Sequence, residues 1–556
     1  MNQVVFDTSE ICYQYGVRQA VFSPGSRNAP LSISFHRNNK INTRVILDER
    51  SAGFIALGIA QQTGKPVVLC CTSGTALLNY GPAIAEAYYQ QIPLIVLSAD
   101  RPPEWIDQWD GQTIRQQGAL ANHIKGFEQL PVDTSGSEAD DYRRKLIALI
   151  ILSQSGQPGP VHCNIPFREP FYPALGHNLQ FSKIEAAGSS KKGSDHEVFS
   201  DSLIASIKGY RRKIIVLGQG HPNDATKELL YHLSNVLHIP VINEITGNGH
   251  EIEGVIEHQD AFLYVKDLWK DLQPDLVLTI GLSTISKNMK LMLRESSCDH
   301  WHIDPVTDRP GNTFQKLTSV IKSFPFDFLK HLTAEHANDP GFQLQWQKAE
   351  RRAENVLEKL STMPYAEYPI FSEVLDALPN GSIVHLANSM PVRYANFLGI
   401  NKKDLTVYCN RGTSGIDGTN STAVGHALSS ERLNILMTGD LSFLYDRNAF
   451  LHEYDLSNLR VIVFNNYGGG IFDLIPGPVS LPLNEKESHF TTPHHKDMKL
   501  SAADAGMHYI KVNDEITLQL TLDGFFDRSD QPKLLEIQTD PKTNQEVYKK
   551  IKNSIQ

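Results

Sequence analysis

ILMTGDLSFLYDRNAFLHEYDLSNLRVIVFNNYGGGIFD (residues 435–473) contains two apolar runs that each end in polar residues and glycine. The first run ends at Gly439 and Asp440, and the second ends at Asn465 and Asn466, just before a run of glycines. Short apolar runs with such ends predict buried β-strands. The spacing between Asp440 and Asn466 fits one βαβ unit, which takes roughly 30 residues. Because parallel strands end at the same edge of a sheet, we expect these two side chains to be neighbours.

Similar apolar runs recur along the whole chain and alternate with amphipathic stretches. The predicted strands include VFSPGS (21–26), PVVLCCTSG (66–74), PLIVLSAD (93–100), KIIVLGQG (213–220), PDLVLTIG (274–281), HWHIDP (300–305), GSIVHLANS (381–389) and LTVYCNRG (405–412). TALLNYGPAIAEAYYQQ (75–91) and FQLQWQKAERRAENVLEKL (342–360) are predicted helices. This alternation predicts an α/β fold of doubly wound parallel sheets.

The chain has 556 residues, which is too long for a single hydrophobic core. The polar stretch EAAGSSKKGSDHE (185–197) predicts a linker, and the helix at 342–360 precedes a further block of strands. We therefore expect three α/β domains, at 1–182, 198–340 and 360–556. In the second domain, GQG lacks the third glycine of a dinucleotide fingerprint, so we do not expect nucleotide binding there.

Composition and charge restrict the class of protein. The net charge of −10 argues against a nucleic-acid partner, which needs a basic surface. Apolar runs fall short of the roughly 20 residues that a membrane helix needs, and the first residues lack the pattern of a signal peptide. The six cysteines form no CxxC pair, which favours reduced structural thiols. We therefore expect a cytoplasmic protein without a membrane span.

Asp440 and Asn466 carry the oxygen ligands that Mg²⁺ prefers. With a backbone carbonyl from Gly468, they could coordinate an octahedral Mg²⁺ that also takes phosphate oxygens and water. Gly468 and Gly469 let the backbone approach such a ligand closely. Taken alone, NNYGGG is more often an ordinary turn. The combination of Gly-Asp at one strand end with Asn-Asn at the next favours the metal site.

This pattern resembles the diphosphate motif of thiamin-diphosphate enzymes, which is Gly-Asp, roughly thirty residues, and then Asn-Asn. The resemblance implies that Asp440, Asn466 and the Gly468 carbonyl hold Mg²⁺ or Mn²⁺. The further cofactor-binding residues that it implies are Ser389, Ile416, Gly439, Leu441, Ser442, Gly469 and Ile471. Ile416 would be the bulky side chain under the bent cofactor. The family usually has glycine where this chain has Leu441, so the leucine side chain is expected to point away from the diphosphate.

A thiamin-diphosphate enzyme also needs a glutamate that bonds a ring nitrogen of the pyrimidine. Glu49 in RVILDERSAGFIALGIA (44–60) is the candidate, because an apolar run ends at Asp48 and a small-residue helix follows. The alternative is an acid that stabilises a helix N-terminus through the helix dipole. The magnesium pattern in the third domain favours the catalytic interpretation of Glu49.

Further motifs narrow the resemblance to one family of these enzymes. SPGSRNAPL (23–31), SADRPPEWIDQWDGQTIRQ (98–116), GLSTISK (281–287), ANSMPVR (387–393) and NRGTSGIDG (410–418) occur in this order. Together they resemble the 2-succinyl-5-enolpyruvyl-6-hydroxy-3-cyclohexene-1-carboxylate synthase family of menaquinone biosynthesis. The resemblance implies decarboxylation of 2-oxoglutarate on thiamin diphosphate and Stetter-like 1,4-addition of the succinyl carbanion equivalent to isochorismate.

Both of these substrates are dianions, so their site must be basic in a protein that is acidic overall. The matching motifs contribute Arg27, Arg101, Lys287, Arg393 and Arg411. Arginine binds carboxylates through paired hydrogen bonds, and lysine acts as a point charge. The resemblance adds Ser26, Gln112, Ser389, Phe472 and Ile475 to the substrate site. It also implies catalytic roles for Ser26, Arg27 and Glu49, and places Arg393 and Arg411 toward isochorismate.

Two alternatives stay open from the sequence. An acetolactate synthase or another thiamin-dependent 2-oxoacid decarboxylase would share the cofactor motif but would not need the basic pocket. A non-catalytic binding protein on the same fold would not need Glu49, Asp440 and Asn466 together. The family resemblance further implies a homodimer or a dimer of dimers, with active sites where subunits meet. His494 and His495 are predicted to lie in a loop without a metal-binding role.

Overall fold

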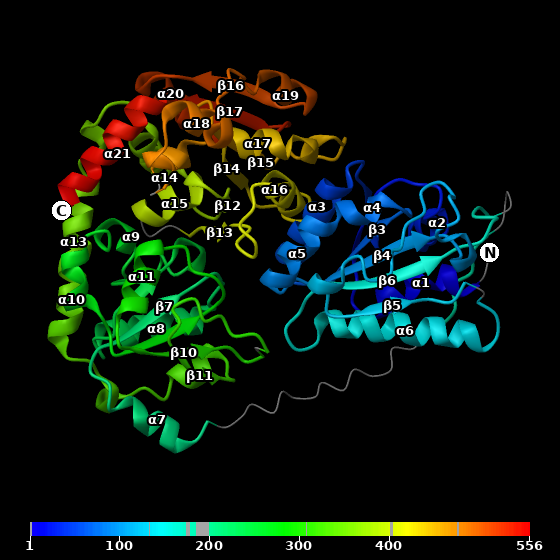
Figure 1. Cartoon of the computed structure of the whole chain (residues 1–556), viewed down its shortest axis with the longest axis horizontal. Coiled ribbons are helices and arrows are strands. Elements are labelled where there is room, and N and C mark those ends of the chain that lie inside the picture. Colours follow the sequence, from blue (N-terminus) through cyan, green and yellow to red (C-terminus); the bar gives the residue numbers. More distant parts are fainter. Residues whose placement is uncertain are drawn as a thin grey trace.

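The computed structural model describes residues 3–132, 134–173, 178–184, 199–306, 308–400, 404–474 and 477–555, and these form three β-sheets flanked by helices (Figure 1). Every strand pair within the three sheets is parallel. The predicted fold class of doubly wound parallel α/β sheets is therefore confirmed.

The first sheet has the strand order β2-β1-β3-β4-β6-β5. Its strands are β1 (Gln19–Phe22), β2 (Asn42–Val45), β3 (Val67–Cys71), β4 (Leu94–Asp100), β5 (Phe127–Gln129) and β6 (Val161–Pro166). Its helices are α1 (Gln3–Gln14), α2 (Ala29–Asn38), α3 (Glu49–Thr63), α4 (Thr75–Asn79), α5 (Gly81–Gln90) and α6 (Ser137–Gln154). The helix expected over 75–91 is divided in two around Tyr80, because Pro82 has no amide hydrogen for the helix and occupies the first turn of α5.

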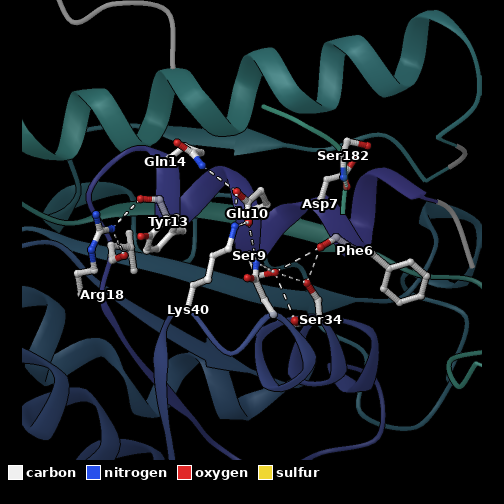
Figure 2. Close-up of polar contacts among 12 residues, drawn as sticks. Phe6, Asp7, Ser9, Glu10, Tyr13, Gln14, Arg18, Ser34, Lys40 and Ser182 are labelled. Atoms are coloured by element: carbon white, nitrogen blue, oxygen red, sulfur yellow. Dashed lines mark hydrogen bonds and ion pairs between the residues drawn. The ribbon is translucent and has the colours of Figure 1, made fainter. Parts of the chain in front are cut away.

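Polar contacts join helix α1 to α2, to Lys40 and to the segment 178–184 (Figure 2), and its apolar side chains belong to a buried cluster of the first domain. Ser34 donates to the Phe6 carbonyl at 2.6 Å, and the Lys40 ammonium lies 2.8 Å from the Glu10 carboxylate. The Ser182 amide donates to Asp7 at 2.9 Å. The described segment 178–184 therefore returns to α1, and the buried polar groups of this helix have partners.

The second sheet has the order β11-β10-β9-β7-β8. Its strands are β7 (Lys213–Leu217), β8 (Val241–Asn243), β9 (Leu276–Ile280), β10 (Asp299–Ile303) and β11 (Leu317–Ile321). Its helices are α7 (Asp201–Ile207), α8 (Asp224–Asn235), α9 (Gln259–Phe262), α10 (Trp269–Leu272), α11 (Lys287–Glu295) and α12 (Pro325–Leu329). The long helix α13 (Pro340–Leu357) follows, where the sequence predicted a helix, and packs against the C-terminal helix α21 (Pro541–Ile555).

The third sheet has the order β13-β12-β14-β15-β17-β16. Its strands are β12 (Ile383–Leu386), β13 (Thr406–Tyr408), β14 (Asn434–Gly439), β15 (Leu459–Asn465), β16 (His508–Val512) and β17 (Lys533–Gln538). Its helices, besides α21, are α14 (Glu367–Ala377), α15 (Met390–Leu398), α16 (Thr419–Ala427), α17 (Asp440–Tyr445), α18 (Leu483–Lys486), α19 (Lys499–Asp504) and α20 (Glu515–Phe525). Strands β14 and β15 are adjacent, as the opening stretch predicted.

The proposed domain boundaries remain predictions. The predicted linker at 185–197 lies outside the described residues, and α13 occupies the predicted junction between 340 and 360. In the part of the chain that the structure describes, no helix combines the length and the apolar character that crossing a bilayer requires. All six cysteines are described, and each is buried without a disulfide.

Helices α3 and α16 cross in close contact and join the first sheet to the third (Figure 1). A Cβ added to Gly58 would lie 2.3 Å from the Thr422 carbonyl oxygen, and one added to Gly425 would lie 2.3 Å from the Ile55 carbonyl oxygen. Both contacts are with backbone, which cannot move aside as a side chain can. Glycine at both positions is therefore required for this separation of the helices.

We predict that Gly58→Ala lowers the free energy of unfolding by about 1–3 kcal/mol, because the added methyl group must push α3 away from α16. Urea unfolding followed by circular dichroism measures this. Gly524→Ala is the matched control, because Gly524 is an exposed helical glycine whose added Cβ would have its nearest neighbour at 3.8 Å. Equal stability of the Gly58→Ala protein and the wild type would contradict the close contact.

Candidate active site

Asp440 and Asn466 lie together at the carboxyl ends of β14 and β15, as the strand pattern predicted. The Gly468 amide donates to Asp440 Oδ2 at 2.9 Å and to Asn466 Oδ1 at 3.2 Å. The Leu441 amide donates to Asp440 Oδ1 at 2.6 Å. The Asp440 side chain is 4% exposed, so it is a buried carboxylate held by backbone donors at a sheet edge.

A cavity of about 180 Å³ opens beside these residues. Its walls include every cofactor-binding candidate from the third domain, namely Ser389, Ile416, Gly439, Asp440, Leu441, Ser442, Asn466, Gly468, Gly469 and Ile471, together with Phe472. Ile475 lies outside the described residues. A strand-end cavity that combines apolar walls with a few convergent polar groups is typical of a ligand-binding site.

The chemistry of this cavity fits a divalent cation with a diphosphate. Asp440 and Asn466 offer hard oxygen atoms, and the Gly468 peptide lies between them. A Cβ added to Gly470 would lie 2.6 Å from the Asn466 amide nitrogen, so a larger residue there would displace the candidate ligand. The residues present are therefore compatible with the cation and with thiamin diphosphate.

Glu367 at the start of α14 lies in the same cavity wall and was not predicted. It is 3% exposed, accepts a hydrogen bond from Asn466 Nδ2 at 2.7 Å and accepts another from the Tyr394 hydroxyl. Burial raises the pKa of Glu367 to about 7, with a smaller upward contribution from Asp440 and opposing hydrogen bonds. The local sequence around Glu367 contains no motif that could have identified it.

His494 also contacts a candidate metal ligand. It lies in a loop, as predicted, but its Nε2 is 3.1 Å from Asp440 Oδ2. The Lys496 amide donates to Nδ1 of the same ring at 3.1 Å. Because Nδ1 accepts, Nε2 carries the proton and donates to Asp440. The sequence predicted the loop but not this contact with Asp440.

The loop around Ile416 is held against the cavity by two polar side chains. Asn388 Nδ2 donates to the Asn410 and Gly415 carbonyls at 2.7 Å each, and the Ser442 hydroxyl donates to the Ile416 carbonyl at 3.2 Å. These bonds hold the backbone around Ile416, whose side chain lines the cavity together with Ser389 and Asp440. Asn388 belongs to the ANSMPVR motif but was not singled out from the sequence.

Glu49 begins helix α3, and both of its neighbours bind the third domain. Asp48 caps α3 by accepting from the Arg50 amide at 2.9 Å, and it also accepts from Asn448 Nδ2 at 2.7 Å. The Arg50 guanidinium donates to the Tyr445 carbonyl at 2.8 Å. Tyr445 ends α17, the helix that Asp440 begins, so Glu49 lies at the contact between the first and third sheets.

Glu49 also lines a cavity of about 420 Å³ in the first domain. Gln112 and Ser73 are part of the same wall. The Arg101 guanidinium donates to the Ser73 hydroxyl and, through Nε, to Asp110 at 3.1 Å. This cavity therefore brings two of the predicted residues, Glu49 and Gln112, together and places Arg101 at its edge.

Arg27 lies near Arg101, with its guanidinium 4.4 Å from the centre of the Phe171 ring. It donates to the Phe167 carbonyl at 3.0 Å. Burial and then the positive charge of Arg101 lower the pKa of Arg27. The negative charges of Asp110, Glu169 and Asp100 act on Arg27 in the opposite direction. Ser26, the preceding residue, is exposed.

Arg393 and Arg411 form a second basic group beside Ser389. Arg393 Nη1 donates to the Ser389 carbonyl at 2.5 Å, and Arg411 Nη1 donates to Asn388 Oδ1 at 3.1 Å. Partial desolvation and then the charge of Arg411 lower the pKa of Arg393. The buried Nε of Arg411 has no partner among the described protein atoms, so it retains a donor for a ligand.

The candidate lysine of the central domain, Lys287, has a second lysine near it in α11. Lys287 is exposed at the first turn of α11, whereas Lys290 lines a cavity of about 390 Å³ together with Arg411. Burial lowers the pKa of Lys290, and the charge of Arg411 contributes in the same direction. Lys290 lies one helical turn beyond Lys287 and was not identified from the sequence.

Comparison with known proteins bears directly on this site. A family model described as thiamine pyrophosphate enzyme, N-terminal TPP binding domain, matches residues 4–124, which include Glu49. That match covers the first sheet up to β4 and the loop that follows it.

Full-length relatives share one name, 2-succinyl-5-enolpyruvyl-6-hydroxy-3-cyclohexene-1-carboxylate synthase. The relative from Cytophaga hutchinsonii is 42% identical over 100% of this chain and 99% of its own length. Those from Flavobacterium johnsoniae and Christiangramia forsetii are 38% and 37% identical over 97% of this chain and 96% of their own. This chain therefore belongs to the 2-succinyl-5-enolpyruvyl-6-hydroxy-3-cyclohexene-1-carboxylate synthase family of thiamin-diphosphate enzymes.

Proposed function

We propose that this protein decarboxylates 2-oxoglutarate and adds the resulting succinyl group to isochorismate, giving 2-succinyl-5-enolpyruvyl-6-hydroxy-3-cyclohexene-1-carboxylate and CO₂. The observation that carries the proposal is the meeting of Asp440, Asn466 and Gly468 in one cavity, with Arg393 and Arg411 bonded to residues of its wall. When bound, thiamin diphosphate supplies the electron sink for decarboxylation and carbon–carbon bond formation.

Asp440, Asn466 and the Gly468 carbonyl would hold Mg²⁺ or Mn²⁺, and with it the diphosphate of the cofactor. Ser442 and Gly439 lie where further contacts to the diphosphate are expected, and Ile416 would support the bent cofactor. Glu49 would exchange a proton with the pyrimidine ring nitrogen. Its place at the start of α3, beside the segment that follows Asp440, supports this role.

The two basic groups would bind the substrate carboxylates. Ser26, Arg27, Arg101 and Gln112 would come from the first domain, and Ser389, Arg393 and Arg411 would come from the third. A local concentration of arginine is notable in a protein of net charge −10, because it directs dianions to this site. We assign Arg393 and Arg411 to isochorismate and include Lys287 and Phe472 in the substrate site.

We further propose a cytoplasmic homodimer or dimer of dimers with active sites where subunits meet. The α3–α16 crossing joins a first and a third sheet within the described chain. This crossing is an example of close packing between a first and a third domain.

The test of the proposed reaction is an omission assay that follows isochorismate loss by absorbance. The complete mixture holds enzyme, 2-oxoglutarate, thiamin diphosphate, Mg²⁺ and isochorismate, and each small component is left out in turn. We expect loss only when all four are present. Activity with pyruvate and without isochorismate would instead identify an acetolactate synthase or a simple decarboxylase.

We predict that Glu49→Gln keeps cofactor binding but lowers turnover by about 10²–10⁴-fold, the range for losing a general acid or base. Calorimetric titration with thiamin diphosphate measures the first property, and the omission assay measures the second. Glu138→Gln in α6 is the control, because Glu138 is an exposed glutamate of the same domain. Full turnover by the Glu49→Gln enzyme would remove Glu49 from the mechanism.

We predict that Arg393→Ala spares CO₂ release from 2-oxoglutarate but slows the addition to isochorismate by roughly 10–100-fold, since a charge-assisted hydrogen bond contributes about 1.5–3 kcal/mol. Parallel assays of CO₂ and product formation separate the two steps. Arg351→Ala, at an exposed arginine of α13, is the control. Equal damage to both steps would show that Arg393 does not belong to the acceptor site.

A further inference from the structure

To bind the cation, the side-chain amide of Asn466 must present its oxygen and not its nitrogen. Its oxygen and nitrogen have almost the same shape, but only the oxygen can bind a metal. The two orientations of the amide differ by a half-turn about one bond. Neighbouring groups must therefore select the orientation that presents Oδ1 to Asp440 and Gly468.

Glu367 lies on the opposite side of this amide. Its Oε1 accepts from Asn466 Nδ2 at 2.7 Å, and its Oε2 accepts from the Tyr394 hydroxyl. The Glu367 side chain is almost fully buried, and its own backbone amide is fixed by Asn544 Oδ1 at 2.9 Å. The carboxylate therefore has little freedom to leave Asn466.

The oxygen end of the Asn466 amide faces a hydrogen-bond donor. Asn466 Oδ1 accepts from the Gly468 amide at 3.2 Å. If the amide turned over, Oδ1 would face a carboxylate oxygen, and Nδ2 would face the Gly468 amide hydrogen. Both contacts would then be repulsive, so the same orientation is favoured from both sides.

We propose that Glu367 is a positioning residue that holds Asn466 with its oxygen directed to the cation site. The role depends on the acceptor oxygen Oε1, which Glu367 presents to Asn466 Nδ2. Partners of this kind typically change metal affinity by about 10–100-fold when they are altered. This inference rests on the proposed metal site and adds a residue that the sequence motif does not contain.

A double-mutant cycle tests the direction of this hydrogen bond. Glu367→Gln replaces the acceptor with an amide, whose nitrogen can donate to Asn466 and turn its amide over. Asn466→Asp places two carboxyl groups against each other. The double variant Glu367→Gln/Asn466→Asp reverses the bond, so that Gln at 367 donates to Asp at 466 and the net charge is unchanged.

The readout is the dissociation constant for Mn²⁺ in the presence of thiamin diphosphate, measured by electron paramagnetic resonance. We expect Glu367→Gln to weaken Mn²⁺ binding by about tenfold or more when residue 466 is Asn. We expect the same substitution to strengthen Mn²⁺ binding when residue 466 is Asp. A merely structural role for Glu367 predicts weaker binding in both backgrounds.

Glu244→Gln is the matched control. Glu244 is fully buried and accepts from the Ile285 amide at 2.8 Å and from the Ser286 amide at 3.2 Å, so it is a buried, hydrogen-bonded glutamate outside the walls of the metal cavity. We expect it to alter thermal stability without changing Mn²⁺ affinity. A comparable loss of Mn²⁺ affinity in Glu244→Gln would overturn a specific role for Glu367.

The outcomes separate this inference from the proposed function. A wild-type protein that binds no Mn²⁺ with thiamin diphosphate would overturn both. Tight wild-type binding with Glu367→Gln acting in the same direction in both backgrounds would overturn the role of Glu367 alone. Opposite directions in the two backgrounds would establish the role.

Discussion

The pairing of β14 with β15 is the constraint on which the candidate site depends. In its register, Gly439 lies opposite Phe464, so the chain leaves the sheet at neighbouring points. Asp440 and Asn466 follow directly, and the Gly468 amide joins them. A parallel ladder holds this spacing through regular hydrogen bonds and two buried faces. The strands thus provide the rigid support that a cation site needs.

Because this arrangement is buried, each of its polar side chains needs hydrogen-bond partners. Asp440 has backbone donors on both oxygens and His494 as a further partner, while Glu367 has two side-chain donors. A buried polar group without partners is costly, so each of these side chains restricts its neighbours. The cavity is therefore a connected polar network in which a change at one residue reaches the others.

The parts of the fold and of the site that could be predicted are marked by short patterns in the sequence. Apolar runs with polar ends located the strands, and the Gly-Asp and Asn-Asn pairs located the strand-end cavity. Glu367 could not be predicted in this way, because it reaches Asn466 only through tertiary packing of α14. Lys290 was missed for a smaller reason: the motif GLSTISK ends at Lys287, the first residue of α11, and the lysine that lines the cavity lies one helical turn later. The division of the helix around Tyr80 had a visible cause in Pro82.

The glycine contact between α3 and α16 also limits how the first and third sheets can move relative to each other. Backbone atoms meet backbone atoms at Gly58 and Gly425, and so tight a contact resists both sliding and separation of the two helices. Opening the first sheet away from the third would expose this contact to water and lose its packing. A hinge movement between these two sheets within one chain is therefore unfavourable, and we expect them to move as one body.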